Sequence, residues 1–170
     1  MKSTLTALLA ICLFWTLGCG GEPTTDPNAG GDQGTTNKPT NKPLPKDFES
    51  LKALAEKGDA RAQYKLGYAY DEGQGVPKND KEAVKWYRKA AEQGYASAQS
   101  NLGYAYDWGK GVLEDDVTAY AWYNIAATNG QATAKKNKPI TAKKMTADQI
   151  AEGQKLSREM LKKNPKLLGE

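Results

Sequence analysis

The chain has 170 residues, of which 39% are apolar and 26% are charged, and 24 Lys and Arg residues outnumber 20 Asp and Glu residues. It contains no histidine, and its two cysteines are Cys12 and Cys19. These features exclude histidine-based catalytic triads, histidine-ligated zinc and a disulfide framework in the body of the chain. A mean hydropathy of -0.73 argues against a polytopic membrane protein.

The first predicted element is a targeting segment. Residues 5–17 form an almost unbroken apolar stretch that has the length of a signal-peptide core and is too short to span a bilayer. Small residues then lead into Cys19. This end resembles a bacterial lipoprotein signal, although Thr16 stands where leucine is usual. An ordinary secretory signal, cut elsewhere, is the alternative.

The resemblance to a lipoprotein signal implies a location in the cell. Residues 1–18 would be removed as the signal peptide, and Cys19 would be acylated and anchor the chain to a bacterial membrane. Gly20, where some lipoproteins have aspartate, favours the outer membrane in a cell that has two membranes. The body would then face the periplasm or the cell surface.

A tether is predicted after the cysteine. Residues 19–45 are rich in glycine, proline and threonine and contain almost no apolar side chains. Such a segment cannot bury enough apolar surface to offset the entropy of ordering it. We expect it to be disordered.

The body of the chain repeats with a period of 36 residues. Residues 66–71 (Leu-Gly-Tyr-Ala-Tyr-Asp) are identical to residues 102–107, and further identical pairs follow as far as Gly94 and Gly130. A fixed period of about 20–50 residues is typical of an array in which each unit covers the next. The sequence therefore predicts a repeat architecture.

Within one unit the pattern predicts two antiparallel helices. In residues 60–72 apolar side chains recur at helical spacing on one face. Gly73 and Gly75 follow, where a helix end needs left-handed backbone. Asn79 is expected to cap a second helix that runs to about Gln93. The side chains expected to be buried are Ala62, Leu66, Ala69 and Tyr70 in the first helix and Ala83, Tyr87, Ala90 and Ala91 in the second, with Trp86 at its edge.

The repeated residues form the pattern Ala-x-Ala-Gln-x-x-Leu-Gly-x-x-Tyr-x-x-Gly-x-Gly-Val, then Asp-x-x-x-Ala-x-x-Trp-Tyr-x-x-Ala-Ala-x-x-Gly. This pattern is similar to the Sel1-like repeat, a relative of the tetratricopeptide repeat. The resemblance implies an all-α protein, a short α/α solenoid of helix-turn-helix repeats with a C-terminal capping helix. It divides the body into an N-terminal half-repeat helix (46–59), two full repeats (60–95 and 96–131) and a basic C-terminal capping segment (132–170).

The C-terminal segment departs from the period. Pro139 stands where a third repeat would have the glycine of its first helix, so that helix is expected to be shortened or to start late, near Asn137. Residues 146–149 carry a capping-box signature before an apolar stripe. The segment has ten basic residues against four acidic ones. It is interpreted as a cap with a solvated face, and contact with acidic lipid head groups or anionic envelope polymers is the alternative.

Candidate partner-binding residues lie on the stripe of the first helices beside the buried face. In this class of repeat the first helices line the concave side of the superhelix. Trp108 stands out because its counterpart is Glu72, so the repeat pattern does not require an aromatic residue there, and exposed Trp, Tyr and Arg are typical of binding hot spots. The alternative is that the tyrosines merely pack between repeats. The stripe consists of Arg61, Lys65, Tyr68 and Glu72, with the counterparts Ser97, Asn101, Tyr104 and Trp108.

Other motifs have structural interpretations. The Gly-x-Gly pairs follow helices and lack the remainder of a phosphate-binding loop, so they are predicted to be turns. Residues 114–116 (Glu-Asp-Asp) could hold a cation but are expected to cap a helix. The sequence shows no Ser-x-x-Lys or Lys-Thr-Gly motif of penicillin-binding proteins. No cofactor, metal or nucleic-acid partner is predicted.

The sequence thus favours a non-enzymatic adaptor on the bacterial cell envelope that binds a protein or peptide in its groove. A second hypothesis is a protein that binds or hydrolyses peptidoglycan or another glycan. A third is a structural subunit whose short array is completed by another chain.

Overall fold

The structure is a computed structural model that describes residues 47–169. Its elements are, in chain order, α1 (Phe48–Glu56), α2 (Ala60–Glu72), α3 (Asp80–Glu92), α4 (Ala96–Asp107), α5 (Asp116–Thr128), α6 (Ala132–Ala142), α7 (Ala147–Lys163) and the short 3-10 helix η1 (Pro165–Leu168). This range contains no strand, which confirms the predicted all-α solenoid. The predicted signal peptide, Cys19 and the tether lie outside the described residues.

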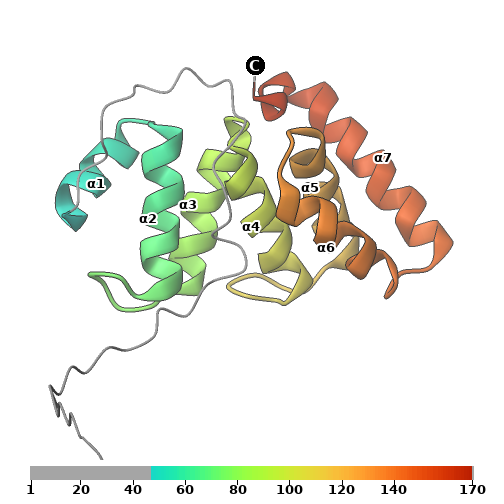
Figure 1. The fold of residues 1–170 in the computed structure, drawn as a ribbon, viewed down its shortest axis with the longest axis horizontal. Coiled ribbons are helices and arrows are strands. Elements are labelled where there is room, and N and C mark those ends of the chain that lie inside the picture. Colours follow the sequence, from blue (N-terminus) through green and yellow to red (C-terminus); the bar gives the residue numbers. More distant parts are fainter. Residues whose placement is uncertain (1–46, 170) are drawn as a thin grey trace, which may run out of the picture.

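The helices stand side by side as antiparallel pairs (Figure 1). α2 pairs with α3 and α4 with α5, while α3 packs against α4 and so stacks one repeat on the next. α1 packs on α2 at one end of the row. At the other end α6 and α7 both pack against α5. None of the described helices is long and apolar enough to cross a membrane.

The helix ends lie where the sequence places them. Gly73 follows α2 with a φ of 71°, a left-handed conformation that glycine adopts without strain. At the start of most helices a side chain accepts a hydrogen bond from a backbone N–H of the first turn. These caps are Asp47, Asp59, Asn79, Asp115, Gln131 and Thr146, and Thr146 forms the predicted capping box with Gln149.

A tyrosine on a glycine joins the two helices of each repeat. Gly67 of α2 lies under the ring of Tyr87 from α3, and Gly103 of α4 lies under the ring of Tyr123 from α5. A Cβ atom at these glycines would lie 2.7 Å and 2.8 Å from the ring carbons. Both tyrosines are at most 2% exposed. The predicted burial of the alanine and leucine faces around them is confirmed.

The expectation that the helix containing Pro139 starts late, near Asn137, was wrong. α6 starts at Ala132, which is in register with Ala96 of the preceding repeat, and Pro139 lies inside it. The side chain of Gln131 accepts a hydrogen bond from the backbone N–H of Thr133 and stabilises this early start. Since Pro139 is exposed, water can solvate the carbonyl group that loses its helical partner.

The end of the described chain folds back over the second repeat. Leu167 of η1 is 3% exposed, and its carbonyl oxygen accepts hydrogen bonds from Gln99 Nε2 at 2.8 Å and Asn129 Nδ2 at 2.6 Å. Gly94 allows this approach, because a Cβ atom there would lie 2.4 Å from the carbonyl oxygen of Lys166. α7 and η1 therefore cover α5 and the turn before α4.

Replacing the two equivalent residues Gly103 and Pro139 by alanine should change stability in opposite directions. Gly103→Ala should lower the free energy of unfolding by about 1–2 kcal/mol, because overpacking against a buried ring exceeds the gain in helix propensity. Pro139→Ala should raise it by about 1–2 kcal/mol, because a helical hydrogen bond is restored at an exposed site. Urea unfolding of the two variants measures both changes. A stabilised Gly103→Ala protein would contradict the tight packing of this glycine.

Candidate functional site

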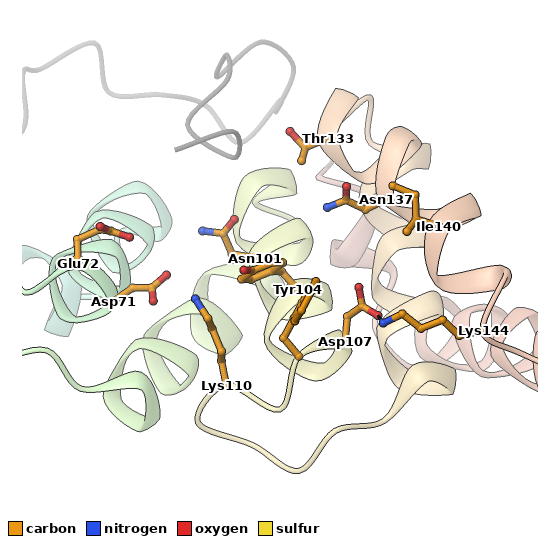
Figure 2. A pocket seen from close by; sticks show the side chains of 11 residues that line it. Asp71, Glu72, Asn101, Tyr104, Asp107, Lys110, Thr133, Asn137, Ile140 and Lys144 are labelled. Atoms are coloured by element: carbon orange, nitrogen blue, oxygen red, sulfur yellow. Dashed lines mark hydrogen bonds and ion pairs between the residues drawn. The ribbon is translucent and has the colours of Figure 1, made fainter. Parts of the chain in front are cut away.

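A groove of about 280 Å³ crosses the face formed by the first helices of successive repeats (Figure 2). α2, α4 and α6 line it, together with the residues that follow α4 and α6. The first helices therefore form one continuous concave wall, as the repeat class implies. The lining residues are Asp71, Glu72, Asn101, Tyr104, Asp107, Trp108, Lys110, Thr133, Asn137, Ile140 and Lys144.

A chain of three hydrogen-bonding groups lies beneath the groove in the first repeat. The hydroxyl group of Tyr87 donates to Asp71 Oδ2 at 3.2 Å and accepts a hydrogen bond from the side chain of Asn101. Burial, with the nearby Asp71 carboxylate, raises the pKa of Tyr87 far above its ordinary value. The phenol therefore stays protonated and keeps the direction of both hydrogen bonds.

The second repeat retains the tyrosine–asparagine bond of this chain, with an aspartate nearby. Asn137 Nδ2 donates to the hydroxyl group of Tyr123 at 3.5 Å, and burial together with the Asp107 carboxylate raises the pKa of Tyr123. Asn137 follows Asn101 by the repeat period, on the neighbouring first helix. Both amides project into the space between α2 and α6 (Figure 2). Because one N–H of each amide is directed at a tyrosine, the orientation of each amide is fixed.

An aromatic pair forms the centre of the groove. The rings of Tyr104 and Trp108 lie 6.0 Å apart, with an angle of 41° between their planes. Lys110 Nζ lies 4.9 Å from the centre of the Tyr104 ring, and Lys144 Nζ lies 5.3 Å from that of Trp108. Such cation–π contacts hold the two lysines at the edges of the aromatic surface.

One of these lysines is also part of an ion pair. Lys144 Nζ lies 2.9 Å from Asp107 Oδ1 (Figure 2), and the side chain of Asp107 is 6% exposed. This hydrogen bond raises the pKa of Lys144. Lys110 forms no ion pair with any residue in the described range. The groove therefore contains a neutralised pair near α6 and a separate ammonium group near α2.

Apolar side chains stay exposed beside these amides and charged groups. Three large apolar residues are exposed in the described part of the chain: Trp108 at 62%, Ile140 at 55% and Leu113 at 89%. Trp108 and Ile140 both line the groove, whereas Leu113 lies outside it. The groove thus presents two uncovered apolar groups next to hydrogen-bonding amides.

The groove brings together part of the predicted stripe. Glu72, Asn101, Tyr104 and Trp108 line it. Arg61, Lys65 and Tyr68 do not: Tyr68 is half-buried against the main core, and Lys65 is exposed, with its Nζ 5.8 Å from the ring of Tyr64. Arg61 is half-buried, and Ser97 accepts a hydrogen bond from Gln131.

Sequence reasoning missed the contribution of α6. Thr133, Asn137 and Ile140 follow Ser97, Asn101 and Tyr104 by 36 residues, so the repeat period itself could have found them. The expectation that the helix is shortened or starts late, near Asn137, hid this register. Asp71 and Asp107 were visible as identical repeat positions, but their contact with the tyrosines could be recognised only in the folded chain.

The remaining motifs have local roles. Gly73, Gly75, Gly109 and Gly111 all have positive φ and form turns, as predicted. In the acidic run 114–116 the side chain of Asp115 caps α5 by accepting from the backbone N–H of Thr118 at 3.0 Å. Burial raises the pKa of Asp116. Among residues 47–169 there is no cluster of three or more acidic or cysteine side chains arranged to hold a metal ion.

The fold and groove define a short α-helical repeat protein with a groove on the face of its first helices. The model of the Sel1 repeat matches residues 60–95 and 96–131. A solved Sel1 repeat protein from Oxalobacter formigenes is 41% identical, with a TM-score of 0.53, over 54% of this chain and 69% of that one. The chain belongs to the Sel1 repeat family.

Two further relatives are longer. The solved structure of c5321, described as a protective antigen of uropathogenic Escherichia coli with an SLR fold, is 41% identical, with a TM-score of 0.67, over 71% of this chain. The secretory immunoglobulin A-binding protein EsiB of Escherichia coli O6:H1 (strain CFT073) is 43% identical over 44 residues, or 26% of this chain. The chain spans 26% of the first protein and 9% of the second. Sel1 repeat proteins are generally protein-interaction scaffolds without enzymatic activity.

The hydroxyl group of Tyr87 should contribute measurably to stability. Tyr87→Phe should lower the free energy of unfolding by about 1–2 kcal/mol, because Asp71 and Asn101 each lose a hydrogen-bond partner. Tyr70→Phe is the matched control, since the Tyr70 hydroxyl makes no hydrogen bond with a described residue, and should change stability by less than about 0.5 kcal/mol. Thermal and urea unfolding of both variants make the comparison, and equal effects would exclude the proposed chain of hydrogen bonds.

Proposed function

We propose that this protein is a non-enzymatic binding module of the bacterial cell envelope, and that it holds an extended segment of a partner protein in the groove between α2, α4 and α6. The observation that carries this proposal is the exposure of Trp108 and Ile140 directly beside two oriented asparagine amides. Exposed apolar side chains in a concave surface are typical of an interaction site.

The two amides suit the main chain of a peptide. An asparagine side chain offers both an N–H donor and a C=O acceptor, which complements the C=O and N–H of a peptide group regardless of the peptide's sequence. Asn101 of α4 and Asn137 of α6 would therefore contact different peptide groups along an extended chain that crosses the groove.

The aromatic pair would supply most of the affinity. Tyr104 and Trp108 with Ile140 form an apolar surface that a large apolar side chain of the partner could cover. Tryptophan and tyrosine are enriched among the few residues that dominate binding energy. Lys110 would interact with a carboxylate of the partner at the edge of this surface, because it has no ion-pair partner in the described chain.

The proposed location at the cell envelope is supported by the N-terminal sequence and by two similar proteins. Residues 5–17 and Cys19 resemble a lipoprotein signal, and we propose that Cys19 is acylated and anchors the body to a membrane through residues 20–46. An immunoglobulin-binding protein and a protective antigen are among the similar proteins, and both descriptions fit contact with molecules outside the cell.

Removing the Trp108 ring should remove partner capture. In a crosslinking pull-down from membranes, Trp108→Ala should recover at least about tenfold less of the specific partner than the wild type, because truncating a central hot-spot aromatic costs 2 kcal/mol or more. Leu113→Ala is the matched control: it removes a similarly exposed apolar side chain outside the groove and should leave recovery unchanged.

The three other outcomes of this experiment are distinct. Equal recovery with Trp108→Ala would exclude the groove as the interface. Equal loss in both variants would indicate nonspecific apolar binding. A wild-type protein that captures no partner would contradict the adaptor function and favour the glycan-binding alternative, which binding to purified peptidoglycan would then test.

Acylation of Cys19 has a direct test. Growth with a radiolabelled or alkyne-tagged fatty acid should label the wild-type chain, and the label should be absent from Cys19→Ser, because serine cannot replace the modified thiol. Fractionation should show the wild type in the membrane. Equal labelling of both chains, or no labelling of the wild type, would contradict the anchor while leaving the groove untouched.

A further inference from the structure

One face of α6 is exposed, although the equivalent residues of α4 are buried. In the second repeat several elements contact the corresponding residues of α4: Gln99 donates to the carbonyl oxygens of Ala91 and Leu167, and Asp107 pairs with Lys144. On α4 this face includes Gln99 and Ser100, each 0% exposed, and Asp107, 5% exposed. The residues 36 positions later are Lys135, Lys136 and Lys143, and all three are exposed. α7 packs against α5 and leaves this face of α6 open.

The charge on this face is not balanced locally. Between Asp116 and Asp148 the sequence contains five lysines and no acidic residue. Two of these lysines have partners: Lys138 Nζ donates to Asn124 Oδ1 at 3.1 Å, and Lys144 pairs with Asp107. The three lysines on the open face form no ion pair with a described residue. We call Lys135, Lys136 and Lys143 the α6 basic face.

We propose that the α6 basic face docks on an anionic lipid surface. The face is the side of a helix, its three lysines lie outside the groove, and the exposed Pro139 lies among them. Lysine makes point-charge contacts that do not require a fixed partner geometry, which suits a fluid layer of head groups. The apolar ring of Pro139, among these cations, would enter the head-group region.

The chain is long enough to allow this contact. The 27 residues from 20 to 46 could reach at most about 90 Å from an anchored Cys19, whereas a domain of this size has a radius of gyration of about 14 Å. α6 lies at the opposite end of the row from α1 (Figure 1), so the body would lie along the membrane instead of standing on its N-terminal end. Each lysine near an anionic surface strengthens binding about fivefold, and three together strengthen it roughly 100-fold.

The test uses the full chain, purified from the envelope with the N-terminus that it carries there. The protein is mixed with phosphatidylcholine vesicles with or without phosphatidylglycerol, and its lysines are acetylated briefly and quantified by mass spectrometry. Acetylation of Lys135, Lys136 and Lys143 should slow at least about fivefold when phosphatidylglycerol is present and recover at high salt. Lys57, Lys81 and Lys85, which are also exposed, should keep their rates.

Two double variants test whether the three lysines are protected together, as one docking face, or each by its own local surroundings. In Lys135→Gln/Lys136→Gln, the remaining Lys143 should lose its protection, because it alone cannot hold the face on the membrane. In Lys57→Gln/Lys81→Gln, which removes the same charge elsewhere, the protection should persist. Surface substitutions of this kind leave stability within about 0.5 kcal/mol, so folding is not at issue.

Three results would overturn the proposal. Slowing of all lysines alike would mean adsorption without a defined face, and no slowing would mean that the face does not touch lipid. Equal protection by soluble polyphosphate with phosphatidylcholine vesicles would assign the face to a soluble polyanion. None of the three lysines lines the groove, so each of these results leaves the proposed partner binding intact.

Discussion

The contact on which this structure depends is that of a buried tyrosine ring with a helical glycine. Gly67 with Tyr87, and Gly103 with Tyr123, let the two helices of each repeat approach until ring and backbone touch. The hydroxyl groups of the same tyrosines reach the concave side, where Tyr87 bonds to Asp71 and Asn101, and Tyr123 bonds to Asn137 with the Asp107 carboxylate nearby. In each repeat, the packing of the two helices and the hydrogen bonds beneath the groove therefore rely on the same tyrosine side chain. A change that moves the ring would disturb both.

The groove combines polar groups held in fixed orientations with apolar side chains that are exposed to solvent. Its amides are oriented by buried phenols that stay protonated, while Trp108 and Ile140 remain open to solvent. Preorganised polar groups lose little entropy on binding, and uncovered apolar groups gain most from being covered. Such a site could bind the main chain of different partners through its amides and select among them by the apolar side chain that each partner places on Trp108 and Ile140.

The repeat period predicted most of the fold because each unit repeats the same local rules: an apolar face at helical spacing, a cap and a terminating glycine. Of the stripe that it predicted, Asn101, Tyr104 and Trp108 line the groove, whereas Arg61, Lys65 and Tyr68 do not. It did not reveal the third wall of the groove, because Pro139 appeared to break the helix, whereas an exposed proline near the end of a short helix is tolerated. The joining of Asp71 to Asn101 through Tyr87 could not be predicted, since it depends on side-chain directions between helices that periodicity does not specify.

The docking of η1 has a consequence for how the chain folds. In an ideal solenoid each unit contacts only its neighbours, so units can form and melt one after another. Here the bonds from Gln99 to Leu167 and from Asn164 to Glu92 join residues 68 and 72 positions apart. Closing such long loops raises the contact order and couples the last residues to the middle of the array. The two repeats should consequently unfold in a single cooperative transition, unlike the gradual melting of an open array.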